Sequence, residues 1–321
     1  MTPSSPAPRL TLGLPVYNGE RFLAESLDAL LAQTFTDFEL IVSDNASEDS
    51  TPEIARAYAT RDPRVRYVRH PRNLGSAFNH NYVIANARGE FFKWVSDDDL
   101  YAPDLLRRCV EALDTRPELV GSHAWTAFID TDGKITHRLD YALASDVPDV
   151  SRRFRSALYV QGGDDIYAVM RTAVLRRVQP CGSHHLADRT FMAELFLNGP
   201  FHNVPDYLYF RRDHPRRADR VAPSLRRRCV HLDPRRADRR RHPVVRLVAE
   251  YLGWYLVSIW RAPISLTDRL RCTRDLVVWV LGHVRWPGGR RAHLRNSPDP
   301  ATVALAGRPR PAPEPAGGGD S

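Results

Sequence analysis

Three consecutive carboxylates follow an apolar run in the first half of the chain. The segment EFFKWVSDDDLYAP spans residues 90–103 and contains Asp97, Asp98 and Asp99. Adjacent like charges repel, so this group needs a cation or polar ligand nearby. Carboxylates at the exit of a buried strand can share a hard divalent cation such as Mg²⁺ or Mn²⁺ and leave metal positions open for phosphate oxygens. The alternative is a helix cap, which explains one acid and leaves two unexplained.

Two further polar segments carry residue types that bind nucleotides. In IVSDNASEDST, residues 41–51, Asp44 is placed to accept a hydrogen bond from the imide N–H of a nucleobase. An Asx-turn followed by a helix cap explains this segment equally well. In RNLGSAFNHN, residues 72–81, Gly75 permits close backbone approach and Asn73 can bond a ribose or phosphate, although a tight turn is the alternative. Arg69 is either a diphosphate contact or a surface charge.

Alternating strands and helices position these segments. Apolar runs predict strands, and apolar residues at helical spacing predict helices between them. The strands are expected at 10–17, 38–44, 64–70 and 89–96, and the helices at 20–33, 49–59 and 76–87. This alternation indicates an α/β fold with a parallel sheet, which binds ligands at the carboxyl ends of its strands. The polar residues directly after the strands, at 15–18, 44–49, 73–75 and 97–99, are therefore expected to converge.

The second half of the chain has a less regular pattern. We expect a helix at 104–117, a strand at 119–130, a turn at 131–134, a strand running into a helix at 164–178, a helix at 186–199, a strand pair or ribbon at 201–215, and two or three Trp-containing helices at 244–286. The Arg-rich stretch 211–246 has interleaved Asp residues and no aromatic stacking platform, so it predicts a solvated, partly flexible surface segment and no nucleic-acid site.

Composition limits the classes of protein that fit. A chain of 321 residues with 43% hydrophobic content can bury a sizeable core, and its net charge of +8 favours anionic small ligands. The four cysteines lie far apart, which argues against a zinc site and a disulfide scaffold. The N-terminal MTPSSPAPRL has no apolar core of a signal peptide, so a cytoplasmic location is expected.

The order and spacing of the motifs resemble those of the family 2 glycosyltransferases, which have the GT-A fold. The segments that carry the resemblance are LTLGLPVYNGERFLAESLDALLAQTFTDFELIVSDNASEDST, then RNLG, then GEFFKWVSDDDLYAP. The resemblance is close over residues 9–130 and looser over 160–215. It implies a GT-A domain at 9–215, with a nucleotide-sugar half at 9–99 and an acceptor half at 100–215. The remaining segments are expected to be a flexible tail at 1–8, an Arg-rich and helical extension at 216–286 and, from its composition, a disordered tail at 287–321.

In this family the residues after the first strand hold the base and ribose of a nucleoside diphosphate sugar. The resemblance therefore points to Pro15, Tyr17 and Glu20, and it assigns Asp44 to the base. It adds Asn73 and Gly75 to the nucleotide-sugar site.

The acidic motif of the family holds metal and pyrophosphate and usually reads Asp-x-Asp-Asp. Here Ser96 occupies the first acid position and Asp97 the variable one. The match assigns Asp99 to the metal and Asp98 to a sugar or ribose contact. Asp97 joins the nucleotide-sugar site, or replaces the missing acid through its spacing to Asp99.

The acceptor half of the family commonly has an Asp at the start of a helix that acts as general base. The segment HHLADRTFMAELFLNG makes Asp188 that candidate, with a helix N-cap as the alternative and Arg189 as an acceptor or phosphate contact. The family's aromatic-Arg-x-His pattern matches FRRDH. It implies that His214 binds the metal or a phosphate, and that Arg211 or Arg212 neutralises the leaving diphosphate.

The resemblance implies a metal-dependent, inverting transfer of a sugar from a nucleoside diphosphate sugar to an acceptor hydroxyl. The cofactor would be Mn²⁺ or Mg²⁺. One rival is a sugar nucleotidyltransferase, but PVYNGERF is not the Gly-rich basic phosphate loop such an enzyme needs. A noncatalytic nucleotide-sugar or glycan-binding protein is the other. The helices with Trp254, Trp260 and Trp279 are expected to pack on the catalytic domain, and peripheral contact with the inner face of a membrane is the alternative.

Overall fold

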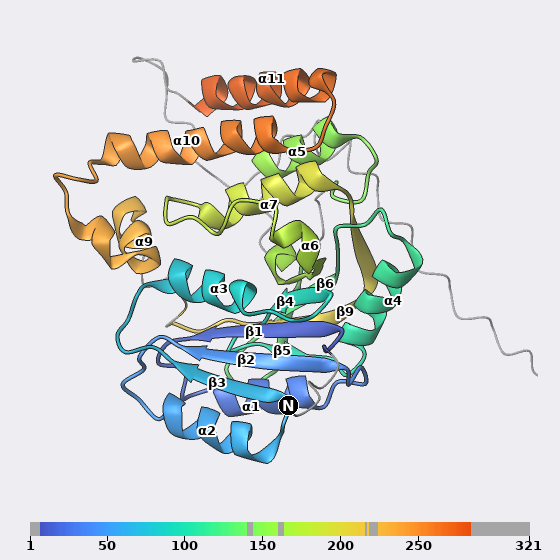
Figure 1. Cartoon of the computed structure of the whole chain (residues 1–321), viewed down its shortest axis with the longest axis vertical. Helices are drawn as coiled ribbons and strands as arrows, with labels where there is room; N and C mark the ends of the chain where they lie inside the picture. The colour runs from blue at the N-terminus through green and yellow to red at the C-terminus, as the bar shows by residue number, and fades with distance from the viewer. Residues whose placement is uncertain (1–6, 140–143, 160–163, 216, 218–223, 284–321) are drawn as a thin grey trace, which may run out of the picture.

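The computed structural model describes residues 7–139, 144–159, 164–215, 217 and 224–283. The tail expected at 287–321, and most of the one expected at 1–8, lie outside these residues. Figure 1 shows a sheet with helices on both faces and two long helices, α10 and α11, stacked at one end of the molecule.

Nine strands of the described residues form one sheet, in the order β3-β2-β1-β4-β8-β6-β9-β5, with β7 paired to β6. Their bounds are β1 Leu10–Val16, β2 Phe38–Asp44, β3 Val65–Arg69, β4 Phe91–Trp94, β5 Leu100–Tyr101, β6 Gly121–Ile129, β7 Ile135–Arg138, β8 Val169–Arg171 and β9 Phe201–Arg212. Strands β1 to β4 pair in parallel, as the alternating pattern predicts. β8 is antiparallel to both β4 and β6, while β9 is parallel to β6.

The helices cover the two faces of this sheet. One core cluster joins the sheet to α1 Leu23–Leu31, α2 Thr51–Arg61 and α4 Leu105–Thr115. The other face packs against α3 Ser76–Ala85, α5 Val150–Tyr159, α6 Thr172–Leu175 and α7 Ala187–Asn198. The remaining helices are η1 Asp164–Tyr167, α9 Leu225–Leu232, η2 Pro234–Ala237, α10 Val244–Arg261 and α11 Leu266–His283. The expected α/β class with a mostly parallel sheet in a GT-A arrangement is confirmed.

The two long C-terminal helices share a core with the sheet domain. Tyr255 of α10 and Trp279 of α11 belong to the same buried cluster as Phe154 of α5 and Phe196 of α7. Buried Asp275 of α11 also accepts a hydrogen bond from Ser151 of α5 at 2.8 Å. The expected packing of the Trp-containing helices on this domain therefore fits Trp279, whereas Trp260 is 48% exposed. None of the helices described has the length and apolar character needed to cross a bilayer.

Residues 201–215 differ from the expected strand pair. They form one long strand, β9, because β6 runs beside it along its whole length. The pairing register shifts twice around Trp125, where β9 passes Pro205. Proline has no N–H to donate to the ladder, and an irregularity there absorbs it without ending the strand.

The Arg-rich stretch also differs from a purely solvated segment. Its described part contains α9 and η2, and Cys229 of α9 is buried. Ser224 caps the N-terminus of α9, because its side chain accepts a hydrogen bond from the Arg227 N–H.

Replacing Trp279 with Ala should lower the free energy of unfolding by about 3–5 kcal/mol, because a large buried ring leaves a cavity in the shared core. The matched control is Val278→Ala, the next residue along α11, which is 54% exposed and should change stability by less than about 0.5 kcal/mol. Urea unfolding measures both. Equal midpoints for the two variants would contradict the packing of α11 on this domain.

Candidate functional site

A cleft of about 690 Å³ lies at the carboxyl ends of β1, β2 and β4. This is the edge of the sheet where the sequence predicts convergence of polar residues. The side chains that line it come from the ends of these strands, the start of α3, the segment after β9, and α9 with η2. The cleft therefore combines the first half of the chain with residues more than 200 positions from its start.

The loops after β1 and β2 hold each other in place beside the cleft. The Asn18 N–H donates to Ser47 Oγ at 2.9 Å, and the Asn18 side chain accepts from the Glu48 N–H at 2.9 Å. The Gly19 N–H donates to Thr51 Oγ1 at 2.9 Å. These ties present Pro15 and Tyr17 to the cleft.

Asp44 and Glu20 do not line the cleft. The Asp44 carboxylate is buried and accepts hydrogen bonds from the Ser47 N–H at 2.8 Å and the Tyr67 hydroxyl at 2.7 Å. The Ser47 contact is a local bond from the backbone to a side chain three residues earlier, so Asp44 shapes the loop. Glu20 is exposed and accepts from the Ser50 N–H at 3.0 Å. Asn45, the neighbour of Asp44, lines the cleft.

Arg69 also supports this loop. Its guanidinium donates to the Ser47 carbonyl at 2.7 Å and lies 3.5 Å from Asp44 Oδ2, outside the cleft lining.

Asn73 and Gly75 occupy the turn that leads into α3. Asn73 lines the cleft, and its side-chain oxygen accepts from Asn45 Nδ2 and from the Gly75 N–H, both at 2.9 Å. Gly75 has φ +92°, and a Cβ there would lie 2.3 Å from the Leu232 carbonyl oxygen. The glycine thus permits close approach of α9, whereas the sequence suggested close approach of a ligand.

The three acids of the loop after β4 point to different places. Asp97 and Asp98 line the cleft. Asp99 is turned inward and is only 1% exposed. Its carboxylate accepts hydrogen bonds from the Tyr209 hydroxyl and, at 2.9 Å, from the Arg212 N–H. The loop continues into β5 and not into a helix, so the helix-cap alternative does not describe these acids.

Asp98 forms a pair with His214. His214 Nε2 lies 2.8 Å from Asp98 Oδ2, and Ser96 Oγ donates to the other carboxylate oxygen. His214 Nδ1 is buried and has no hydrogen-bond partner among the described residues. Asp97 sits against Gly19, where a Cβ would lie 2.1 Å from Asp97 Oδ2. The resemblance assigned the metal to Asp99 and His214. In the structure the carboxylate beside His214 is that of Asp98, and Asp99 faces inward.

Crowding and burial shift the pKa values of the three acids in different directions. Burial raises the pKa of Asp97 well above its ordinary value, and the charge of Asp98 adds to the effect. Burial, followed by the same Asp98 charge, raises the pKa of Asp99 to about 7. Burial also disfavours the Asp98 carboxylate, but the hydrogen bonds from His214 and Ser96 outweigh it and lower its pKa. Asp98 is therefore the acid whose negative charge the surroundings hold in place.

The arginines near this loop have separate roles. Arg212 is buried, and its guanidinium donates to the Asp98 carbonyl at 2.9 Å and pairs with Glu25 at 2.7 Å. Arg211 lies over the Phe128 ring. Neither lines the cleft, where the sequence expected one of them to meet a diphosphate. Arg217 does line it, with Nη1 4.0 Å from Asp99 Oδ1. Sequence reasoning missed Arg217 because nothing distinguishes it from its many Arg neighbours.

Asp188 and Arg189 lie at the start of α7. Asp188 is exposed in the first turn, directly after Ala187, and does not line the cleft. Arg189 donates to the Ala157 and Leu158 carbonyls, which ties α7 to the end of α5. The structure therefore does not bring the expected general base into contact with the acids.

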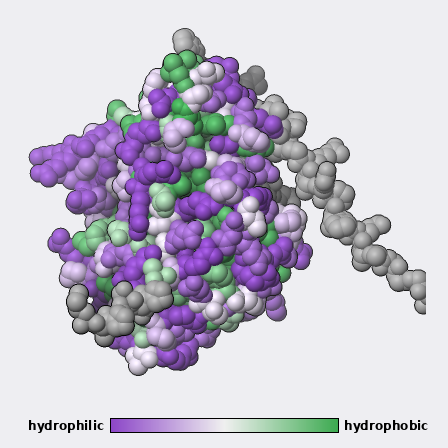
Figure 2. All heavy atoms as spheres, turned by 45° about the vertical axis from the view of Figure 1, so that its right-hand side comes forward, coloured by the Kyte–Doolittle hydropathy of each residue, from purple (hydrophilic) through white to green (hydrophobic). Residues whose placement is uncertain are grey.

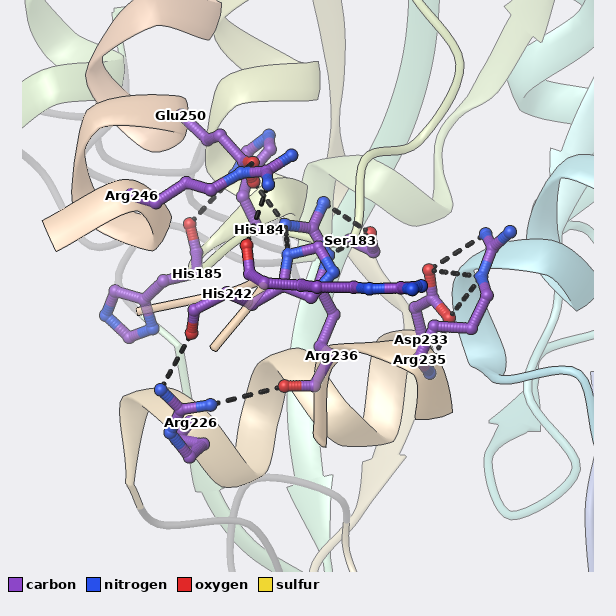
Figure 3. A network of polar contacts seen from close by, with 11 residues as sticks. Ser183, His184, His185, Arg226, Asp233, Arg235, Arg236, His242, Arg246 and Glu250 are labelled. Carbon is purple, nitrogen blue, oxygen red and sulfur yellow. Dashed lines mark hydrogen bonds and ion pairs between the residues drawn. The ribbon is translucent and has the colours of Figure 1, made fainter. Parts of the chain in front are cut away.

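Residues of α9 and η2 form one wall of the cleft, through Val230, His231 and Pro234. Figure 3 shows the network that fixes this wall. The Arg236 guanidinium donates to Ser183 Oγ at 3.0 Å and forms an ion pair with Glu250 of α10. Arg226 of α9 donates to the His242 carbonyl at 2.8 Å. The wall is thus tied both to α10 and to the loop before α7.

Few of the described side chains in the cleft could act as metal ligands. The described residues contain no group of three or more His, Cys, Asp or Glu side chains arranged to hold a metal ion. Among the residues that the structure describes, Asp98 and His214 are an adjacent pair of possible metal ligands in the cleft. Such a pair suits a cation whose other positions are filled by phosphate oxygens and water.

The chain shares its fold with solved structures, and part of its sequence is similar to curated proteins. S. aureus TarS residues 1–349 in complex with UDP-GlcNAc has a TM-score of 0.64 and 18% identity, over 86% of this chain and 74% of that one. An uncharacterized glycosyltransferase of Rickettsia typhi is 37% identical over 34% of this chain and 33% of its own length. EpsJ of Bacillus subtilis, also an uncharacterized glycosyltransferase, is 30% identical over 47% of this chain and 44% of its own length.

The chain thus spans less than half the length of these two curated relatives. The model of the family described as "Glycosyl transferase family 2" matches residues 11–180, which is more than half of the chain and contains the loops after β1, β2 and β4. The chain belongs to glycosyl transferase family 2.

Proposed function

We propose that this protein transfers a sugar from a nucleoside diphosphate sugar to an acceptor hydroxyl. The observation that carries the proposal is the cleft at the strand ends, where the Asp98–His214 pair and Arg217 face one space. A carboxylate–imidazole pair next to a guanidinium suits a diphosphate bound with a cation. TarS, whose fold this chain shares, has been solved with UDP and with UDP-GlcNAc, which makes uridine sugars the first donors to test.

The donor would extend along the cleft from its nucleoside end to its diphosphate. Pro15, Tyr17 and Asn73 meet the base and ribose, with Asn45 added beside them. Asp97 contacts the ribose or the sugar. Arg217 neutralises the diphosphate, a role for which a charged hydrogen bond is well suited. Asp44, Glu20 and Gly75 support this site by shaping its loops and its α9 wall.

Asp98 and His214 are the residues that would hold Mn²⁺ or Mg²⁺. They fit such an ion because the acids around them are crowded and the buried His214 Nδ1 has no partner among the described residues. When bound, the cation supplies positive charge that stabilises the departing diphosphate. Asp99, with its carboxylate engaged by Tyr209 and Arg212, sets the shape of the loop.

The transfer itself needs a base on the acceptor side. Asp188 takes the proton of the acceptor hydroxyl as that oxygen forms a bond to the anomeric carbon. The bond from the anomeric carbon to the phosphate oxygen breaks, and the nucleoside diphosphate leaves with the electron pair. A single displacement of this kind inverts the anomeric centre. Exposure of Asp188 leaves it open to an acceptor that approaches α7.

The proposal is tested by incubating the protein with a panel of UDP, GDP and dTDP sugars and Mn²⁺, and by measuring release of the nucleoside diphosphate. We expect slow donor hydrolysis with at least one sugar nucleotide, and none when the metal is chelated. Binding of a donor without any release indicates a binding protein, and release of pyrophosphate from a nucleoside triphosphate indicates a nucleotidyltransferase. Either result would overturn the proposal.

The roles of two adjacent acids can be separated by Asp98→Asn and Asp99→Asn. Loss of the Asp98 charge should weaken Mn²⁺-dependent binding of the nucleotide about tenfold or more, because the metal loses a charged ligand. Asp99→Asn retains an acceptor for the Arg212 N–H and should change that binding by less than about threefold. Calorimetric titration of UDP with and without Mn²⁺ measures both. The reverse order of effects would restore Asp99 as the metal ligand.

Arg217→Gln should raise the donor KM by about 10- to 100-fold, the value of a lost charged hydrogen bond to phosphate. Arg211→Gln is the matched control, because Arg211 carries the same charge six residues earlier and stays outside the cleft. Its donor KM should stay within about twofold of the wild type. Steady-state donor hydrolysis measures the two variants, and similar KM values for both would exclude Arg217 as the diphosphate contact.

Asp188→Asn should lower kcat by about 10²- to 10⁴-fold in the presence of an acceptor and leave UDP binding unchanged, as expected for loss of a general base. Asp268→Asn removes an acid from the first turn of α11 and controls for the loss of a favourable helix dipole contact. If both variants lose a few tenths of a kcal/mol of stability and keep full kcat, Asp188 is only a helix-terminal acid.

A further inference from the structure

Helix α10 carries an apolar stripe on its exposed side. Val245, Leu256 and Trp260 are between 42% and 79% exposed and follow each other at helical spacing. The same helix buries Leu247, Tyr251 and other residues on its opposite side. Its exposed face therefore does not have the polar character expected of the outer side of a surface helix.

Helix α11 repeats this pattern. Leu266, Leu270, Val277 and Leu281 lie on one face of the helix and are between 49% and 68% exposed. Cys272, Leu276 and Trp279 of the same helix are buried in the shared core. Two consecutive helices thus each have a second apolar face that the described residues leave uncovered.

The two stripes adjoin. The Arg269 guanidinium of α11 lies 6.0 Å from the centre of the Trp260 ring of α10 and donates to the Ala262 carbonyl at 3.1 Å. Figure 1 shows the two helices side by side at the top of the molecule, and Figure 2 shows hydrophobic atoms gathered there. We call the large exposed apolar residues of the two helices the α10–α11 face: Val244, Val245, Val248, Leu256, Val257, Trp260, Leu266, Leu270, Val277, Val278 and Leu281.

Positive charge borders the α10–α11 face. Exposed Arg261 and Arg274 lie on the two helices themselves, and the exposed run 239–241 precedes α10. The nearby acids are fewer than these arginines and are already engaged. Glu250 pairs with Arg236 and Arg246, and Asp268 pairs with Arg271. Asp275 pairs with Arg274, and Asp238 pairs with Arg241. Arg239, Arg240 and Arg261 add positive charge beyond these pairs. The border is therefore cationic and complements an anionic partner.

We propose that the α10–α11 face docks the protein on an anionic lipid bilayer surface. Two adjoining helices with Leu, Val and Trp outward and Arg around them have the composition of interfacial helices, which lie in the headgroup region. This surface is independent of the proposed transfer reaction, because none of its residues lines the donor cleft.

Two other occupants fit the face less well. A second copy of the chain would bring two cationic borders together, and like charges disfavour that pairing. Residues 284–321 contain only five Val, Leu and Trp residues, too few to cover two helical stripes. An anionic bilayer offers both an apolar interior and a negative surface.

The test is sedimentation of the full chain with vesicles of phosphatidylcholine, either alone or with one third phosphatidylglycerol. The wild type should bind the anionic vesicles about tenfold or more tightly than the neutral ones. The triple variant Leu256→Gln, Leu270→Gln, Leu281→Gln should lose about tenfold or more of that binding, because it removes three large apolar side chains from the interface. Gln keeps a high helix propensity, so the helices should persist.

Ile135→Gln is the matched control, since Ile135 is 47% exposed on β7, away from the two helices, and its binding should be unchanged. Equal binding of the wild type and the triple variant would overturn the proposal. The proposal would also be overturned if the wild type sediments as a dimer without vesicles and the triple variant does not. That result would assign the face to a second copy of the chain. UDP binding should be the same in wild type and triple variant, so failure of docking is distinguishable from failure of the proposed transfer.

Discussion

The arrangement of the cleft depends on the contacts of Arg212, whose guanidinium is buried. It joins the end of β9 to the Asp98 carbonyl and to Glu25 of α1, and it lies over the Phe22 ring. The Arg212 N–H also binds Asp99. These contacts draw Asp99 inward, and as a result Asp97 and Asp98 face the cleft. The end of β9 therefore sets how the three adjacent carboxylates are placed, through the Arg212 N–H and the Tyr209 hydroxyl on Asp99 and the Arg212 guanidinium on the Asp98 carbonyl. It also places His214, two residues later, beside Asp98.

The C-terminal helix α10 supports the cleft without lining it. Glu250 of α10 holds Arg236 of η2, and η2 with α9 forms a wall of the cleft that approaches Gly75 closely. The same two long helices bury one face in the domain core and leave the other face apolar and exposed. Their inner face therefore explains stability and the shape of the cleft, while the outer face is free to meet a membrane surface. The two roles use different residues of the same helices, which is why variants can separate them.

The first half of the fold was predictable from the sequence because its signals are local. Strand and helix periods between residues 10 and 96 place each polar loop at the same edge of the sheet, and β1 to β4 follow that pattern. The different orientations of Asp97, Asp98 and Asp99 were not predictable from the sequence. It depends on Tyr209 and Arg212, which are more than 100 residues away, and no local pattern reports such contacts. The same holds for the α9 wall. The run of arginines predicts a solvated segment, and only the contact of Leu232 with Gly75 shows that α9 packs against the cleft.

The most direct measurement is a crystal structure of the protein with UDP and Mn²⁺, with the metal located by its anomalous scattering. We expect Mn²⁺ at Asp98 and His214, and Arg217 in contact with the phosphates. Asp99 should keep its hydrogen bonds from the Tyr209 hydroxyl and the Arg212 N–H. A metal bound by Asp99, or a nucleotide outside the cleft at the ends of β1, β2 and β4, would contradict the proposed site.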